Sequence, residues 1–162
     1  MAKASYLCYW DACVFLSMIE GDADRIPVIN AILHEAEKGE VEIYTSTLSI
    51  TEVAFAKAEK DNKSLDPDVE AKIDKLWQPS SPFKLCDVFD TITIDAKLLI
   101  RQSLVSGGRS LKPADAIHIA TARHLSVNAI HTYDDTMLRA ASLVDFDIEK
   151  PRTDQFTWDA DA

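Results

Sequence analysis

The sequence has few glycines, few cysteines and no long apolar run, and each shortage excludes a class of protein. Only four of its 162 residues are glycine, and neither G-x-G-x-x-G nor G-x-x-x-x-G-K-[ST], the patterns of common phosphate-binding loops, occurs. The longest apolar run, residues 12–19, is interrupted by Ser17 and is too short to cross a bilayer. The N-terminal residues lack the apolar core of a signal peptide, and the three cysteines form no C-x-x-C pair, which predicts free thiols. The sequence therefore favours a cytoplasmic protein without a membrane segment.

Basic residues are also scarce, because 17 lysines and arginines stand against 27 aspartates and glutamates, for a net charge of −10. Such a balance disfavours a protein that coats nucleic acid through a basic surface. Residues 96–133 depart from it, with five basic side chains, a single acid and a net charge of +4. A basic rim beside an acidic centre suits an anionic substrate. The alternative is that these side chains only pair with carbonyl groups at helix ends.

Short apolar runs alternate with helical patterns along the chain. The runs that predict strands are residues 5–10, 41–45, 85–94 and 129–132. The segments that predict helices are residues 14–20, 26–38, 48–60, 66–76, 96–106, 113–125 and 136–141, with Gly39 and Gly107-Gly108 as stops and Pro113 as a start. This order predicts an α/β fold in which residues 1–149 form one domain of three α/β/α layers around a mostly parallel sheet of about five strands. Residues 150–162 are expected to form a C-terminal tail.

Acidic residues lie where predicted strands pass into helices. In parallel sheets ligands bind beyond the carboxyl ends of the strands, so these acids are expected to converge at one edge. Each could instead cap a helix, because helix N-termini stabilise negative charge, and Ser49-x-x-Glu52 even fits a capping box. The acids at these positions are Asp11, Glu52, Asp115, Asp134 and Asp135.

Apolar neighbours around Glu52 and Asp115 indicate that these two carboxylates point into the domain. Asp115, for example, shares a helical face with Ile119. Several buried carboxylates in one place repel one another unless a cation offsets their charge. Mg²⁺ and Mn²⁺ prefer oxygen ligands, so the pattern predicts a Mg²⁺ or Mn²⁺ site.

Four segments together resemble the PIN domain, the metal-dependent nuclease fold of many VapC-type toxins. They are residues 9–16 (YWDACVFL), 49–54 (SITEVA), 111–122 (LKPADAIHIATA) and 130–135 (IHTYDD). The third is the most specific, because it resembles the family's Asp-Ala-x-Ile-Ala-x-Ala helix. The last resembles the family's Thr-x-Asp motif, which selects Asp134 rather than Asp135.

The resemblance implies an endoribonuclease that hydrolyses RNA phosphodiester bonds to leave a 5′-phosphate and a 3′-hydroxyl. Mg²⁺ or Mn²⁺ would lower the pKa of a bound water and offset charge on the departing oxygen. Single-stranded or looped RNA is the expected substrate, because a splayed strand can enter a narrow acidic cleft. The implied catalytic residues and metal ligands are Asp11, Glu52, Asp115 and Asp134, and the candidate substrate contacts are Arg109, Lys112 and Thr132.

A VapC-type toxin would also have a small antitoxin partner, which would block the site by offering a basic residue to the acids. Trp77 and Trp158 are candidate contacts in a homodimer. The family often has Ser or Asn two residues after its first Asp, where this chain has Cys13. A thiol suits a hard metal poorly, so we expect Cys13 to weaken or tune metal affinity.

The main alternative is a PIN-fold module that has lost its activity and binds protein or RNA, as the overall acidity and Cys13 favour. A haloacid-dehalogenase-like phosphatase is disfavoured, because it needs Asp-x-Asp after the first strand and this chain has Asp11-Ala-Cys13. A serine hydrolase is disfavoured by the lack of a G-x-S-x-G pattern. His118, which lies between Ile117 and Ile119, is interpreted as a core or interface histidine.

Overall fold

The computed structural model describes residues 5–106 and 109–154, and the five strands within them form one sheet. Neighbouring strands are all parallel, in the order β3-β2-β1-β4-β5. The strands are β1 (Tyr6–Trp10), β2 (Val41–Ser46), β3 (Phe83–Cys86), β4 (Ala129–His131) and β5 (Asp147–Glu149). Because all five run the same way, their carboxyl ends meet at one edge of the sheet. The predicted α/β fold is confirmed.

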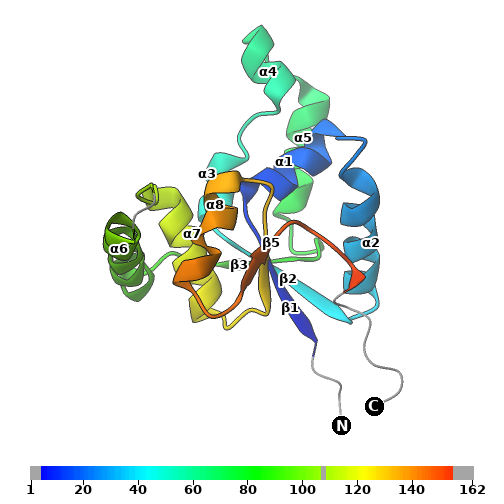
Figure 1. Cartoon of the computed structure of the whole chain (residues 1–162). Helices are drawn as coiled ribbons and strands as arrows, with labels where there is room; N and C mark the ends of the chain where they lie inside the picture. The colour runs from blue at the N-terminus through cyan, green and yellow to red at the C-terminus, as the bar shows by residue number, and fades with distance from the viewer. Residues whose placement is uncertain (1–4, 107–108, 155–162) are drawn as a thin grey trace.

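Helices cover both faces of the sheet and complete the three predicted layers (Figure 1). Within the described residues they are α1 (Ala12–Glu20), α2 (Ile26–Glu37), α3 (Leu48–Glu52), α4 (Lys57–Asn62), α5 (Pro67–Leu76), α6 (Asp90–Val105), α7 (Pro113–His124), α8 (Asp135–Arg139) and the 3₁₀ turn η1 (Ala140–Leu143). One face packs against α6, α7 and α8 through residues such as Leu99 and Ile119. The other packs against α1, α2 and α5 through residues such as Phe15 and Ile29.

The central strand β1 divides its side chains between the two cores. Cys8 and Trp10 belong to the core under α1 and α2, whereas Tyr9 belongs to the core under α6 and α7, and all three are fully buried. Successive side chains of a strand point to opposite faces, so a central strand covered on both sides alternates in this way. Tyr9 is thereby brought against the layer that contains α7, the helix of Asp115.

The single helix predicted over residues 48–60 is wrong, because the chain forms two short helices, α3 and α4, separated by residues 53–56. Val53 leaves the helical conformation at the end of α3, and its side chain is fully buried. The Glu59 carboxylate then accepts the backbone N–H groups of Ala56 (3.1 Å) and Asp66 (2.8 Å), which fixes the start of α4 and the approach to α5. These tertiary contacts outweigh the local helical pattern.

The strand predicted over residues 85–94 is also wrong in its second half. β3 ends at Cys86, and α6 begins at Asp90. Ile92, Ala96 and Leu99, at spacings of four and three residues, are buried in one core, so this segment follows the helical period rather than the alternation of a strand.

Two features of the C-terminal part differ from the sequence prediction. The last strand, β5, was not located by any pattern, because only Ile148 of its three residues is buried. Of the predicted tail, residues 155–162 lie outside the described residues, as do Gly107, Gly108 and the proposed dimer contact Trp158. Trp77 packs against Phe15 in the core, with ring centroids 5.2 Å apart, instead of standing clear as a dimer anchor.

Cys8, Cys13 and Cys86 are free thiols, as predicted. Within the described ranges, no helix combines the length and the apolar character that a membrane span requires.

Candidate active site

Two of the predicted acids follow neighbouring strands and lie at the carboxyl edge of the sheet. Asp11 follows β1 and Asp134 comes three residues after β4, and these strands are paired through Trp10 and His131. The backbone N–H of Asp11 donates to the carbonyl of His131 (3.5 Å), which continues the pairing into the loops. The convergence that the sequence predicts therefore holds for these two acids.

The Asp11 carboxylate is almost fully buried, at 5% exposure, and both of its oxygens are hydrogen-bonded. The Thr132 hydroxyl donates to Oδ2 (2.6 Å), and the Cys13 thiol donates to Oδ1 (2.7 Å). The Thr132 oxygen in turn accepts the backbone N–H of Asp134 (3.0 Å), and the Cys13 sulfur accepts that of Tyr133 (3.1 Å). We call Asp11, Cys13, Thr132 and Asp134 the Asp11 cluster, because one set of hydrogen bonds joins the ends of β1 and β4.

Thr132 was a candidate substrate contact, and its surroundings give it another role. Its side chain is fully buried, and its hydroxyl serves Asp11 and Asp134 at the same time. Thr132 therefore orients the acids instead of presenting its hydroxyl to a substrate.

Asp134 is an exposed residue that caps α8. Its Oδ1 accepts the backbone N–H groups of Thr136 (2.7 Å) and Met137 (3.3 Å). The capping interpretation is thus correct for this oxygen. The other oxygen, Oδ2, makes no hydrogen bond with any described residue, so Asp134 can cap a helix and still offer an oxygen to a ligand.

Asp115 is close enough to Asp11 and Asp134 for their charges to affect its pKa. Burial raises the pKa of Asp11, and the nearby charge of Asp134 raises it further against the opposing hydrogen bonds from Cys13 and Thr132. Burial raises the pKa of half-buried Asp115 as well, and the charges of Asp134 and Asp11 add to the increase. The charge of Asp134 thus raises the pKa of both other acids, and like charges in one place repel, which is the condition under which a bound cation is stabilising.

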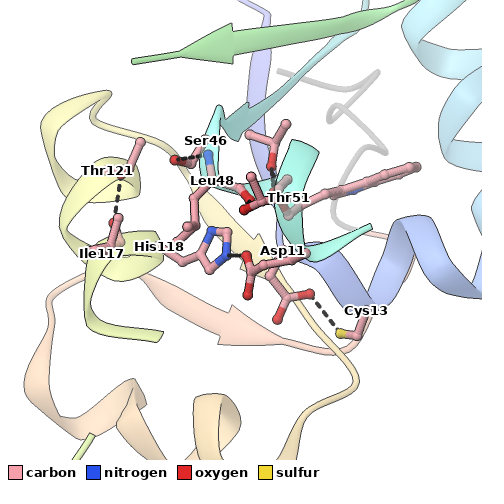
Figure 2. Close-up of polar contacts among 12 residues, drawn as sticks. Asp11, Cys13, Ser46, Leu48, Thr51, Ile117, His118 and Thr121 are labelled. Atoms are coloured by element: carbon pink, nitrogen blue, oxygen red, sulfur yellow. Dashed lines mark hydrogen bonds and ion pairs between the residues drawn. The ribbon is translucent and has the colours of Figure 1, made fainter. Parts of the chain in front are cut away.

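Glu52, the last residue of α3, is held by a separate chain of hydrogen bonds. The Tyr9 hydroxyl accepts the backbone N–H of Ser46 (3.1 Å) and lies 2.6 Å from Nδ1 of His118, and Nε2 of His118 contacts the Glu52 carboxylate. These contacts fit one tautomer, in which the tyrosine O–H donates to Nδ1 and the Nε2–H donates to the carboxylate. We call Ser46, Tyr9, His118 and Glu52 the Glu52 relay. In Figure 2 the His118 imidazole extends from α7, and the Asp11 carboxylate faces Cys13.

The relay changes two expectations from the sequence. His118 is a buried core histidine, as interpreted, but it also contacts an acid of the candidate site. The capping box of Ser49 and Glu52 does not form, because Ser49 lies inside α3 and its hydroxyl lies 2.7 Å from that of Thr45. The position of His118 three residues after Asp115 on one helix was the available signal, since such residues share a face.

The four acids suit a hard divalent cation in their chemistry but do not form a complete ligand set. All offer carboxylate oxygens, which Mg²⁺ and Mn²⁺ prefer. Among the described residues, however, no three His, Cys, Asp or Glu side chains are grouped closely enough to hold one metal ion. A shared ion would require the side chains to draw together.

Basic residues lie on the Asp115 side of the site. Lys112 immediately precedes α7, is exposed, and lowers the pKa of Asp115 against the other influences. Arg109 is exposed and lines a cavity beside α8. Arg123, from the same basic segment, is instead paired with Asp95 (3.3 Å) on the outer side of α7. The basic rim therefore consists of Arg109 and Lys112 rather than the whole segment.

Comparison with known proteins identifies the family. The family model of the PIN domain matches residues 8–143. The chain belongs to the PIN domain family. The four candidate acids of this PIN domain, together with the Asp11 cluster and the Glu52 relay, fall within the matched residues. No curated protein sequence matches the chain significantly.

Solved structures share the fold at low sequence identity. A chain of VapBC2 from Rickettsia felis, bound to a DNA fragment from the promoter, is 15% identical with a TM-score of 0.64, and the match covers 89% of this PIN domain and 98% of that chain. A chain of FitAB bound to the IR36 DNA fragment is 15% identical with a TM-score of 0.65, and the match covers 96% of this PIN domain and 99% of that chain. A chain of FitAcB from Neisseria gonorrhoeae is 15% identical with a TM-score of 0.64, and the match covers 89% of this PIN domain and 97% of that chain. These similarities establish the fold over nearly the whole chain.

Proposed function

We propose that this PIN domain is a metal-dependent endoribonuclease. The observation that carries the proposal is the electrostatic coupling of three acids at the carboxyl edge of a parallel sheet, where the charge of Asp134 raises the pKa of both Asp11 and Asp115. Membership of the PIN family supports nuclease chemistry for such a group of acids. These three residues, together with Glu52, would hold Mg²⁺ or Mn²⁺.

Different residues would hold the metal ligands in place and bind the phosphates of the substrate. A bound divalent ion supplies an activated water and offsets charge on the scissile phosphate. Thr132 and Cys13 hold the Asp11 carboxylate in one orientation, and His118 holds that of Glu52. Preorganised ligands of this kind avoid the cost of ordering side chains during the reaction. Lys112 and Arg109 offer positive charge to phosphates of the approaching strand.

We infer that RNA in single-stranded or looped form is the substrate. The acidic net charge of −10 disfavours an extended duplex on the surface, whereas a splayed strand needs to meet only the site and its basic rim. The free cysteines favour action in the cytoplasm, where thiols stay reduced.

A toxin role with an antitoxin partner is part of the same proposal. The similarity to a chain of VapBC2 supports it, as does the resemblance to VapC-type toxins. The acids of the site would accept a basic side chain from the partner, which would exclude both metal and RNA. A homodimer and a tail from residue 150 onward are further expectations.

The test is cleavage of a 5′-labelled single-stranded RNA by the full chain with Mg²⁺, with Mn²⁺ and with EDTA. We expect cleavage only with metal, and products with a 5′-phosphate and a 3′-hydroxyl. The Asp115→Asn variant controls for a contaminating nuclease, because it removes one carboxylate and keeps the side-chain shape. Cleavage in EDTA, or equal cleavage by this variant, would contradict the proposal.

A binding module without activity is the second candidate, and the lack of a complete ligand set among the described residues favours it. Titration of the full chain with Mn²⁺ by calorimetry separates the two. Heat of binding at millimolar metal that Asp115→Asn removes supports the nuclease. No heat at millimolar metal, with all four acids present, supports the module.

A further inference from the structure

A cavity of about 190 Å³ lies beside α8, and of its lining residues only Arg109 has a part in the proposed chemistry. Its walls come from the end of α6, the segment that leads into α7, and α8 with η1. The polar groups that line it are those of Ser103, Ser106, Arg109, Thr136, Arg139 and Ser142.

The cavity is joined to the acidic site through two of its walls. The backbone N–H of Thr136 donates to Asp134 (2.7 Å), so the first turn of α8 faces both the cavity and that acid. Leu111 precedes Lys112 and the start of α7, whose first turn contains Asp115. The Ser103 hydroxyl accepts the backbone N–H of Leu111 (2.9 Å), which ties this wall to α6. A strand that leaves the acids on the α8 side would therefore pass the cavity.

The charge of the cavity is positive, in contrast to the chain as a whole. Among the described residues, its ionisable lining side chains are the exposed guanidinium groups of Arg109 and Arg139. Among the described residues neither forms an ion pair, whereas Arg25, Arg123 and Arg152 each pair with an acidic side chain. The Nε of Arg139 donates to the carbonyl of Asp135 (3.2 Å), which orients the guanidinium.

We propose that this cavity binds a phosphate of the RNA strand other than the one that is cut. The two guanidinium groups provide planar sets of N–H donors that match phosphate oxygens, and the hydroxyls of Thr136 and Ser142 supply further donors, whereas those of the other two serines already donate to backbone carbonyls. The inference deepens the proposed function, because it takes RNA to be the substrate. It adds Arg139 as a binding residue and assigns Arg109 to a subsite distinct from the metal ligands.

The first experiment measures binding of the full chain in EDTA to a short fluorescent single-stranded RNA by anisotropy. Arg139→Gln and Arg109→Gln are each compared with Arg101→Gln, which removes the same charge from the neighbouring helix α6 outside the cavity. We expect each cavity variant to raise Kd about tenfold, as loss of a charged hydrogen bond does. The slope of log K against log salt should flatten by about 0.7, the value for one phosphate contact on a single strand. Arg101→Gln should change neither quantity by a comparable amount.

The second experiment repeats the comparison with RNAs that carry one neutral methylphosphonate at successive positions. The increase in Kd caused by Arg139→Gln should disappear when the methylphosphonate is at one position, because an uncharged group there makes no ion pair with the guanidinium even in the wild-type protein. That position should differ from the bond that the wild-type protein cuts in Mn²⁺. Equal penalties for Arg139→Gln and Arg101→Gln, or a penalty that no methylphosphonate removes, would overturn the proposal.

The outcomes also separate this subsite from the nuclease proposal. If the wild-type protein cuts RNA and the cavity variants bind it normally, the subsite is wrong and the nuclease stands. If the wild-type protein fails to cut RNA but binding depends on Arg109 and Arg139 at one phosphate, the nuclease is wrong and the subsite stands. Thermal unfolding of each variant checks that the fold is intact, as expected for exposed side chains.

Discussion

The Asp11 cluster and the Glu52 relay hold their acids in different ways. Asp11 is 5% exposed and receives a hydrogen bond at each oxygen from groups that follow β1 and β4. The Glu52 side chain is 29% exposed, and the contact that holds it comes from the buried ring of His118. The Asp11 cluster holds its carboxylate at both oxygens but removes it from water, which is energetically unfavourable. The Glu52 relay holds its carboxylate through one contact and leaves the side chain partly in water. Asp11 is therefore the rigid part of the site and Glu52 the adjustable part.

The largest effect should come from removing charge at the rigid part. Asp11→Asn or Asp115→Asn should reduce RNA cleavage to the level seen in EDTA, because the amide cannot replace a carboxylate ligand. The melting temperature should not fall, since each change removes a carboxylate that burial and neighbouring acids destabilise. Asp135→Asn, in an exposed acid beside Asp134, is the matched control and should cleave normally. Normal cleavage by a folded Asp11→Asn protein would remove Asp11 from the mechanism.

The relay should matter less than the acids themselves. His118→Asn should lower cleavage about 10- to 100-fold, the usual cost of losing a group that orients a metal ligand. The loss should appear as a higher Mn²⁺ concentration for half-maximal rate, because the Glu52 carboxylate is then still present but no longer oriented by His118. Tyr9→Phe, which removes only the hydroxyl, should shift the metal dependence in the same direction by less. An unchanged metal dependence in both variants would mean that the relay is purely structural.

Stability should respond mainly to changes in the Asp11 cluster. Thr132→Val removes a buried hydroxyl that serves Asp11 and Asp134 together, so the free energy of unfolding should fall by about 1–3 kcal/mol. Thr93→Val, at an exposed site on α6, is the control and should stay within about 0.5 kcal/mol of wild type. Equal losses in the two variants, measured by urea unfolding, would contradict the bridging role of Thr132.

The pH dependence of stability should reveal the cost of burying Asp11. Because burial raises the pKa of Asp11 above its ordinary 3.8, the folded protein holds this proton more tightly than the unfolded chain. The contribution of Asp11 to stability in EDTA should therefore be fully present below that ordinary value and be lost as the pH rises through the raised pKa, by at most about 1.4 kcal/mol per pH unit for one group. Asp11→Asn should flatten this fall. Parallel pH profiles for the two proteins would show that Asp11 carries no such cost.

The smallest effect should come from Cys13. Cys13→Ser keeps a donor for Asp11 and an acceptor for the N–H of Tyr133, and its oxygen suits a hard metal better than sulfur does. We expect a rise in Mg²⁺-dependent cleavage of less than about fivefold. A large loss of activity would mean that the thiol has a role that oxygen cannot fill.

The sequence was informative where local patterns and the fold agree. The apolar run before Asp11 and the proline that opens the helix of Asp115 placed both acids correctly, since strand ends and helix starts are local features. Tyr9 lies on the face of β1 opposite Trp10, and nothing local predicted that its hydroxyl meets His118, 109 residues later. The relay depends on the packing of α7 against the sheet, which only the folded chain provides.

Other parts of the site depended on contacts that compete with local preference. The break between α3 and α4, which makes Glu52 the end of a short helix, follows from the burial of Val53 and the hydrogen bonds of Glu59. The double role of Thr132 could not be predicted, because it depends on the pairing of β1 with β4, which brings Thr132 next to Asp11. Arg139 was not a candidate, because its cavity is assembled from three separate segments of the chain.

The most direct test of the central claim is an anomalous-scattering map from crystals of the full chain soaked in Mn²⁺ at neutral pH. The account predicts a Mn²⁺ peak bound by carboxylate oxygens of Asp11, Asp115 and Asp134, with the Glu52 side chain turned toward it. A well-ordered site without a peak at millimolar Mn²⁺, or a peak only elsewhere on the protein, would contradict the claim that these acids form a metal-dependent catalytic centre.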